Sequence, residues 1–535
     1  LFSDYSRQLG DHYFKVMGGF NAEHQNVRTL SAQRDGIIVP DLPTIDTSTE
    51  QDVAGGGYNH WATAGFFGRL NYNYKEKYLL EVNGRYDGTS RFMKDQRWNF
   101  FPSFSLGWNV ARENFWKPLE SVVNQFKLRG SWGELGNQNT SNLYPFYEIL
   151  PVKSNSGNWL VNGGKTNTAD IPSLVSTLLT WERVRSFNVG FDFGAFSNRL
   201  TGSFDYFVRK TVDMVGPAPQ LPLVLGIAPA IVNNADMKSY GFEIELSWRD
   251  RIGEVDYGVK FNLADAQQKV VKYPNTTNAF SDWYAGKMSG EIWGYTSLGI
   301  AKTDEEMKEH LASLPNGGQN QLGNKWGAGD IMYADINGDG KVDGGKGTLA
   351  DPGDQRIIGN STPRYNFGLV LDASYKGFDV SIFFQGVGKR DYAPIVGTNG
   401  AVFWGAVNNI WQSMAMEEHF DYFRPEGHPM GANLNGYYPR PDFTSNKNHQ
   451  VQTRYLQDAS YIRLKNLQIG YTLPKQWINK LHINRCRVYV SGDNLWTGTS
   501  LASMFDPETL AAGDWGSGKT YPLSKVISFG LNVNF

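Results

Sequence analysis

The sequence has very little cysteine, few long apolar runs and almost no net charge. Its 535 residues include a single cysteine, Cys486, which excludes an internal disulfide framework. The longest apolar stretch, Leu221 to Val232, is interrupted by Pro222, Gly226 and Pro229. A helix that spans a bilayer needs about 20 mostly apolar residues, so a helical membrane span is excluded. The formal net charge of −2 gives no electrostatic basis for nucleic-acid binding.

Enzyme signatures are missing too. The sequence contains neither a His-Glu-x-x-His metal pair nor a phosphate-binding glycine loop of the Walker type. The 8 histidines form no cluster with ligand spacing. We therefore predict no catalytic residues and no catalytic cofactor.

A strict two-residue alternation is present instead, and it is clearest in the last stretch, Lys525 to Phe535. Every second side chain there is apolar, and those between are mostly small or polar. Successive side chains of a strand point to opposite faces, so this pattern predicts a strand. Its length matches the roughly 9–11 residues with which a tilted strand crosses a bilayer. A half-buried strand of a soluble protein would show the same alternation, so the other strands must decide.

The same pattern recurs along the whole chain. The segment from Tyr78 to Asp87 alternates aromatic or aliphatic residues with Glu81, Asn83 and Arg85, and a face with so much charge cannot lie in a dry core. Short turns, at 75–77, 197–198, 250–253 and 376–377, alternate with long connections near 26–57, 136–178, 214–236, 269–360, 388–453 and 495–522. Outer-membrane barrels combine short turns at one end with long external loops at the other. We therefore predict one all-β domain over residues 1–535, a transmembrane antiparallel β-barrel of about fourteen strands.

Several stretches resemble the SusC/RagA-like branch of TonB-dependent outer-membrane transporters of Bacteroidota. They are Phe67–Glu81, Arg85–Phe92, Phe101–Trp108, Lys127–Gln138, Asp335–Gly340, Ile358–Tyr365 and Gly492–Trp496. Their order and spread cover nearly the whole chain.

The resemblance implies a 22-stranded outer-membrane barrel with a plug in its lumen, gated by the energy-coupling protein TonB. It further implies a surface lipoprotein of the SusD type that acts as a lid, import of oligosaccharides or peptides, and contact with outer-membrane lipid or lipopolysaccharide. The plug and about eight strands are absent from this sequence. We therefore expect the chain to be the C-terminal part of such a transporter. A passive porin-like channel and an adhesive or structural role remain alternatives.

One acidic loop has the spacing of a calcium site. Asp335, Asn337, Asp339, Lys341 and Asp343 occupy positions 1, 3, 5, 7 and 9 of an EF-hand-type loop, with Lys341 offering its backbone carbonyl. Position 12 is a lysine, so Asp351 or Asp354 could complete the site only if the glycine-rich segment between folds back. Residues of these types also favour a turn without metal. Calcium in this loop would stiffen an external connection.

Aromatic residues of the long loops are candidates for contact with a ligand or a lid protein. The candidates are Trp283, Trp293, Trp404 and Trp411, although such residues more often pack the loop itself. The inward charges of Arg85, Glu243 and Glu245 could steer a solute or line a wet lumen. Cys486 falls on the apolar face and is predicted to face lipid.

Overall fold

The computed structural model describes residues 1–140, 142–216, 224, 226–227, 229–394, 401–405, 416–442, 446–479, 482–510 and 520–535. Within these residues, no helix is long and apolar enough to cross a lipid bilayer.

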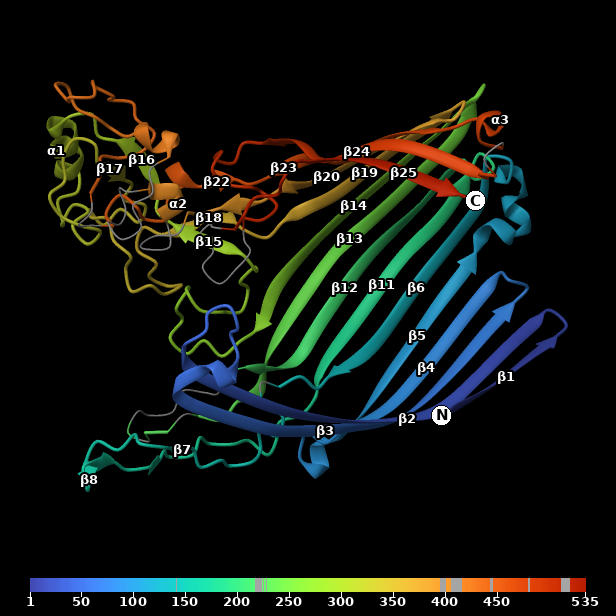
Figure 1. Cartoon of the computed structure of the whole chain (residues 1–535), viewed down its shortest axis with the longest axis horizontal. Coiled ribbons are helices and arrows are strands. Elements are labelled where there is room, and N and C mark those ends of the chain that lie inside the picture. Colours follow the sequence, from blue (N-terminus) through green and yellow to red (C-terminus); the bar gives the residue numbers. More distant parts are fainter. Residues whose placement is uncertain are drawn as a thin grey trace.

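A single antiparallel sheet dominates the fold (Figure 1). In the described residues it has fifteen strands, which follow one another in the sheet in their order along the chain, with β1 and β25 at the two edges. About fourteen were predicted, and the first strand is paired with the second over its whole length. The strands are β1 (Phe2–Leu9), β2 (His12–Ile37), β3 (Ser48–Tyr74), β4 (Tyr78–Thr89), β5 (Trp98–Asn109), β6 (Val123–Asn137), β11 (Glu182–Ala195), β12 (Leu200–Gly216), β13 (Val232–Ile252), β14 (Val255–Lys272), β19 (Arg364–Tyr375), β20 (Phe378–Lys389), β23 (Tyr461–Thr472), β24 (Arg485–Thr499) and β25 (Val526–Asn534).

The sheet curves, and the two chain ends lie on its opposite edges (Figure 1). On β4 the apolar side chains of Tyr78, Val82 and Tyr86 are exposed, whereas Glu81 and Arg85 on the other face are half-buried. A soluble sheet would bury the apolar face, so this inverted pattern is the one expected where lipid covers that face. The predicted alternation of an apolar outer face and a polar inner face is confirmed.

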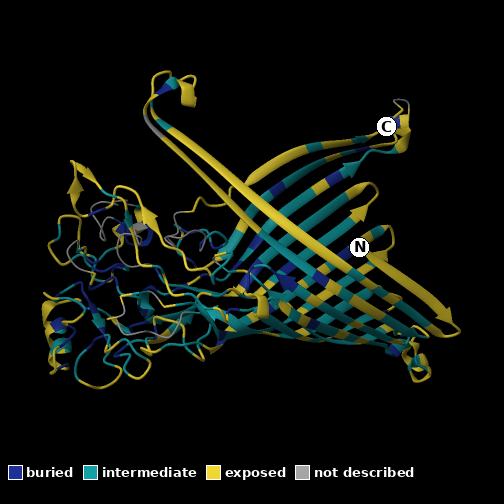
Figure 2. Cartoon of the chain, turned by 90° about the horizontal axis from the view of Figure 1, so that it is seen from below, coloured by how far each residue is buried: buried dark blue, intermediate teal, exposed yellow. Residues whose placement is uncertain are grey.

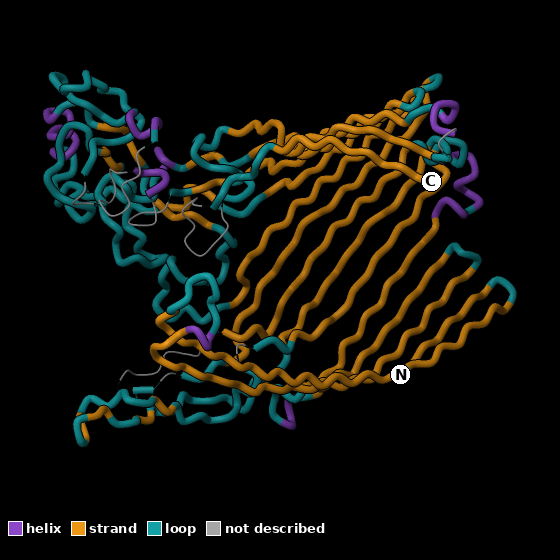
Figure 3. The backbone as a smooth tube through the Cα atoms, viewed as in Figure 1, coloured by secondary structure: helices purple, strands orange, loops and turns teal. Residues whose placement is uncertain are grey.

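The two ends of the strands differ as predicted. Residues 75–77, 253–254 and 376–377 form tight turns, and Phe196–Arg199 closes another. Figure 3 shows these turns at one end of the strands, while the long connections gather at the other. By the orientation of outer-membrane barrels, the end with the long connections faces the outside.

The prediction of a long loop near 26–57 is wrong for most of this range, which is strand. β2 continues to Ile37 and β3 begins at Ser48, and the two stay paired along the whole excursion with one register shift near Arg34. This hairpin is exposed and reaches far beyond the sheet (Figure 2). Water surrounds both of its faces, so neither face needs to be apolar, and the alternation that revealed the other strands is missing there.

The smaller elements belong mostly to the connections. The short strands are β7 (Val152–Lys153), β8 (Leu160–Val161), β9 (Gly164–Lys165), β10 (Thr168–Ala169), β15 (Glu291–Gly294), β16 (Ser297–Ile300), β17 (Ile331–Tyr333), β18 (Arg356–Asn360), β21 (Asp391–Tyr392) and β22 (Gln457–Asp458). The helices are α1 (Asp304–Ala312), α2 (Ala401–Trp404) and α3 (Lys475–Ile478), with 3-10 turns at Ile45–Thr47, Lys94–Gln96, Val110–Arg112, Asn114–Leu119, Glu417–Phe420 and Thr453–Tyr455. α1 begins where the Thr303 hydroxyl accepts a hydrogen bond from the Glu306 N–H at 3.1 Å, which caps the first turn.

Cys486 differs from its prediction. Its side chain is 8 % exposed, so it is buried by the protein instead of facing lipid. The short helix α3 contacts the same strand, and Leu473 donates a backbone hydrogen bond to the Cys486 carbonyl. The prediction that Cys486 lies on the outer face of the strand was correct. The alternation of apolar and polar residues gave no sign that the connection containing α3 covers this end of the strand.

Candidate functional site

Two regions can contact a solute: the polar inner face of the sheet and the compact group of external connections. The strand register determines directly which side chains lie on the inner face. Side chains two residues apart on one strand share a face, and cross-strand partners lie side by side. The polar residues of neighbouring strands therefore form continuous rows on the inner wall.

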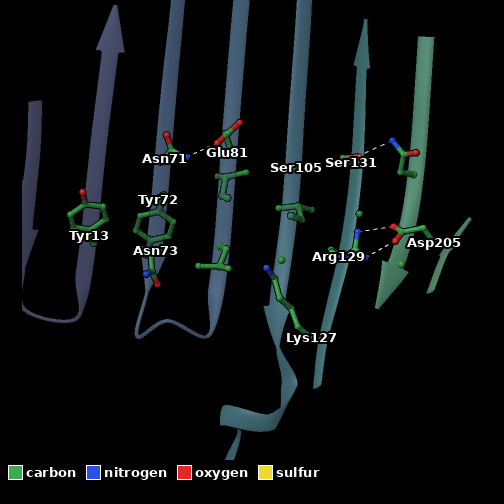
Figure 4. Close-up of a pocket in the computed structure, with 17 residues that line it drawn as sticks. Tyr13, Asn71, Tyr72, Asn73, Glu81, Ser105, Lys127, Arg129, Ser131 and Asp205 are labelled. Atoms are coloured by element: carbon green, nitrogen blue, oxygen red, sulfur yellow. Dashed lines mark hydrogen bonds and ion pairs between the residues drawn. The ribbon is translucent and has the colours of Figure 1, made fainter. Parts of the chain in front are cut away.

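The best-formed part of this wall is an ion-pair cluster near the short-turn end (Figure 4). Arg129 on β6 donates both terminal nitrogens to the carboxylate of Asp205 on β12, each at 2.6 Å. Its Nε donates to Asp192 on β11 at 3.1 Å. Arg129 and Asp205 line a hollow of about 460 Å³ together with Asn71 and Glu81, and Asp192 lines a separate hollow. Such half-exposed charges require water, so this wall belongs to a wet lumen.

The inward charges predicted from the sequence fall on the same wall but differ in their surroundings. Arg85 is held by Asp87 through two hydrogen bonds of 2.9 Å, so little of its charge is left for a solute. Glu243 and Glu245 line neighbouring hollows beside Asn262. Within the described part of the chain, no salt bridge reaches either glutamate. These two carboxylates are the better candidates for contact with a passing solute.

The external connections form an ordered module with a core of its own. We define the external module as the described residues of three connections, 273–363, 390–460 and 500–525; Figure 1 shows the first two gathered around α1, α2 and β15–β18. Its core combines buried side chains from all three connections: Tyr295, Leu314, Ile331, Tyr333, Val342, Val402, Phe403, Trp404, Tyr438, Tyr455, Ala459, Leu501, Phe505 and Leu510. The sequence predicted long loops here but not their joint packing. Contacts between residues more than 100 positions apart leave no local pattern.

A buried ion cluster joins the first two connections of the module. Asp330 is fully buried and accepts hydrogen bonds from Arg440 at 2.8 and 2.7 Å and from Lys447 at 2.9 Å. Asn448 donates to the same carboxylate at 2.9 Å. Lys447 is itself 1 % exposed. Buried charges persist only when they are paired, so this cluster holds the two connections in one arrangement.

A second ion cluster ties the third connection to the barrel. Arg463, near the outer end of β23, donates to Asp506 and to Glu508, each at 2.8 Å. Burial alone would raise the pKa of the Asp506 carboxyl, but hydrogen bonds from Arg463 and from the backbone N–H groups of Glu508 and Leu523 outweigh it and hold the pKa below its usual range. The module is therefore anchored to the wall by charge as well as by its core.

The four tryptophans selected from the sequence do not share one role. Trp404 is 1 % exposed in the core of the module, so the expectation that it contacts a ligand or lid is wrong; it packs the module. Trp293 stacks on Phe280 with ring centroids 4.6 Å apart. Trp283 is 39 % exposed, with the Lys287 ammonium 5.7 Å from its ring centre. Trp411 lies outside the described residues.

The acidic loop folds back as the calcium prediction required. Asp354 is fully buried, and its carboxylate accepts the N–H groups of Ile336 at 2.7 Å and of Asp343 at 2.8 Å, so it closes both ends of the loop. Burial raises the pKa of Asp354. Asp335 accepts the N–H groups of Gly338 and Gly340 at 2.6 and 2.8 Å.

The remaining members of the loop are bonded within it. Asn337 and Asp339 accept backbone N–H groups two residues ahead, at 3.0 and 3.2 Å. The Lys341 ammonium lies 2.5 Å from the Asp343 carboxylate and lowers the pKa of that acid. In the part of the chain that the structure describes, no three or more His, Cys, Asp or Glu side chains are grouped as metal ligands. Calcium in this loop stays a prediction.

Comparison with known proteins supports the interpretation of the wall. Residues 2–495 match the family model of the TonB dependent receptor-like β-barrel. The chain belongs to this family. The TonB-dependent receptor β-barrels of this kind are outer-membrane proteins, so the predicted location in the outer membrane is confirmed.

Individual relatives support the SusC/RagA-like resemblance. The chain is 28% identical over 570 residues to TonB-dependent receptor P3 of Formosa agariphila, covering 99% of this chain and 51% of the relative. It is 24% identical to TonB-dependent receptor SusC of Bacteroides thetaiotaomicron, covering 100% of this chain and 50% of the relative. The solved RagAB peptide transporter shares the fold, with a TM-score of 0.77 at 21% identity over 100% of this chain and 55% of the solved one. The chain thus spans about half the length of the relatives it matches.

Proposed function

We propose that this barrel forms part of the wall of an active importer driven through TonB. The observation that carries the proposal is the match of residues 2–495 to the TonB dependent receptor-like β-barrel family. A wet, charged inner wall and an ordered module at the external end support it. The first gives a polar solute a path, and the second gives it a surface for capture outside the membrane.

The proposal for the partners and the cargo is supported by the relatives. SusC and the RagAB peptide transporter are among the proteins most similar to the chain. For this chain we propose a SusD-like lipoprotein lid, energy coupling by TonB, and an oligosaccharide or peptide as cargo. Of the tryptophans selected from the sequence, Trp283 is the one that we propose for contact with lid or cargo, because its side chain is 39 % exposed on an external connection.

Uptake measured with and without TonB tests the proposal. We expect cells that carry the whole protein to accumulate the labelled nutrient only when TonB and the proton gradient are intact, because the import step is energy-driven. Loss of the gradient with TonB present should have the same effect as loss of TonB. Uptake that persists unchanged in a strain without TonB would instead indicate passive diffusion through an open pore.

We also propose that the loop Asp335–Asp343 holds calcium, from its ligand spacing and from the fold-back of Asp354. A calcium chelator is then expected to increase protease cleavage within residues 330–355, because the loop would lose its central cation. Asp335→Asn keeps an acceptor for only one of the two glycine N–H groups and removes a charge, so cleavage of its loop should already be raised and should respond less to chelator. Cleavage of the wild-type loop that is identical with and without chelator would contradict calcium binding.

A further inference from the structure

Four basic side chains form one row across the outer face of the sheet. The strand register places Arg185 on β11 opposite Lys210 on β12, Lys210 opposite Lys238 on β13, and Lys238 opposite Lys269 on β14. The strand register is regular from this row toward the short turns as far as the neighbouring apolar residues, so side chains two residues apart on each strand keep the same face. With neighbouring strands about 4.8 Å apart, the row spans about 15 Å. Figure 1 shows these four strands side by side.

The row lies on the face that carries the apolar belt. Phe187 and Val189 on β11 are 48% and 45% exposed and share their face with Arg185, two residues away. The next row toward the short turns is aromatic and aliphatic: Trp132, Phe187, Val208 and Tyr240 are consecutive cross-strand partners. Aromatic side chains collect at both edges of the hydrocarbon layer.

The position along the strands places the row at the outer surface of the membrane. Lys210 lies ten residues from Leu200, where β12 leaves its short turn, and Arg185 lies ten residues from Ala195 at the same turn. A tilted strand crosses the hydrocarbon layer in about 9–11 residues. Arg185 and Lys210 are therefore one membrane crossing away from the short-turn end. Lys238 and Lys269 lie farther from theirs, fourteen residues from Ile252 and Val255, so the whole row is on the side of the long external connections.

The positive charge of the row is mostly uncompensated. Like charges directly opposite each other destabilise a sheet. Glu134 bonds Arg185 at 3.3 Å, but in the described chain no carboxylate forms a salt bridge with Lys210, Lys238 or Lys269. The next acids on this face are Asp236 and Asp265. Asp236, two residues from Lys238 on β13, accepts the Asp213 backbone N–H at 3.0 Å, and Asp265 is engaged by Arg364 through both of its oxygens. Among the described residues, the three neighbouring ammonium groups thus form no salt bridge, and an anion from outside the chain would relieve their repulsion.

We propose that this row binds the phosphate groups of lipopolysaccharide in the outer leaflet. A phosphate can accept hydrogen bonds from several ammonium groups at once, and its charge removes the repulsion along the row. The long lysine side chains can lie along the apolar belt while their ammonium groups reach the headgroup layer. The proposal depends on the outer-membrane location and not on import, so a negative result for one of the two proposals does not affect the other.

Lipid binding to the protein purified from outer membranes in neutral detergent tests this site. The probe is lipid A with its phosphates or after enzymatic dephosphorylation, and bound copies are counted by native mass spectrometry. We expect the double variant Lys210→Gln with Lys238→Gln to bind phosphorylated lipid A about 25-fold more weakly, at about fivefold for each lysine near a charged surface. Dephosphorylated lipid A should bind wild type and variant equally weakly.

A second pair of substitutions on the inner face serves as the matched control. Arg209 is the neighbour of Lys210 on β12 and points to the opposite face, and Lys260 lies on the inner face of β14. Arg209→Gln with Lys260→Gln removes the same charge and should leave lipid A binding unchanged. Equal weakening in both pairs would show a general charge effect and overturn the site. So would wild-type binding that does not depend on the phosphates, which would indicate apolar contact only.

Discussion

Asp330→Ala is expected to open the external module while the barrel stays folded. The substitution removes the carboxylate that lies 2.9 Å from the Lys447 ammonium, which is 1 % exposed, and leaves Asp442 at 3.8 Å as the next acid in the described residues. The carbonyls of Asn324 and Lys325 still accept from this ammonium but carry no full charge. It also removes both hydrogen bonds of Arg440 to this acid. Breaking a buried ion pair by removing one partner costs about 3–5 kcal/mol, because a buried charge is left uncompensated. Asp442 should keep the loss near the lower end of that range.

Limited proteolysis of the purified protein measures this opening. New cleavage is expected within residues 290–460 for Asp330→Ala, while the heat-dependent shift of the band on gels, which reports a closed barrel, stays as in wild type. Asp421→Ala is the matched control, because Asp421 is an exposed acid of the same module whose carboxylate accepts a hydrogen bond from Asn433 and, in the described residues, forms no salt bridge. If Asp330→Ala resists protease as well as Asp421→Ala does, the buried cluster does not hold the module together.

Mild acid is expected to destabilise the same module through His449. This side chain is 1 % exposed and packs on Trp404 with ring centroids 4.6 Å apart. In the described chain neither of its ring nitrogens has a hydrogen-bond partner. Burial lowers the pKa of His449 to about 4. Between that value and about 6.5, His449 is protonated in the unfolded state but stays neutral in the folded state. Its contribution to the stability of the module is therefore fully present above pH 6.5 and decreases as the pH drops toward 4.

The expected loss from this histidine is about 2 kcal/mol at pH 5. Hydrogen exchange of module amides measured from pH 7.5 to 5, corrected for the intrinsic exchange rate, should show it. His449→Phe removes the titrating group, keeps a ring against Trp404 and should flatten most of the pH dependence. Burial also lowers the pKa of His310, so a smaller slope of the same sign should remain. A variant with the full wild-type slope would contradict the assignment to His449.

Much of the barrel could be predicted from the sequence, because residues that alternate along a strand show which side chains belong to each of its two faces. The alternation around Tyr78, Glu81 and Arg85 predicted both the strand and its wet inner face. The prediction failed on the hairpin of β2 and β3, where water covers both faces and no apolar alternation is required. It failed on Trp404 because an aromatic residue in a long loop has the same local sequence whether it is exposed or buried.

By itself the sequence determined the all-β class, the crossing strands with their short turns, the long external connections and the family. These depend on residue patterns within about ten positions, which the two-residue period of a strand displays directly. Only the tertiary structure decided how the connections pack into a module, which acid pairs with Lys447, and that four basic residues from four strands stand in one row. Each of these depends on pairing between segments distant in the chain, and a one-residue change of register would send every side chain of a strand to the other face.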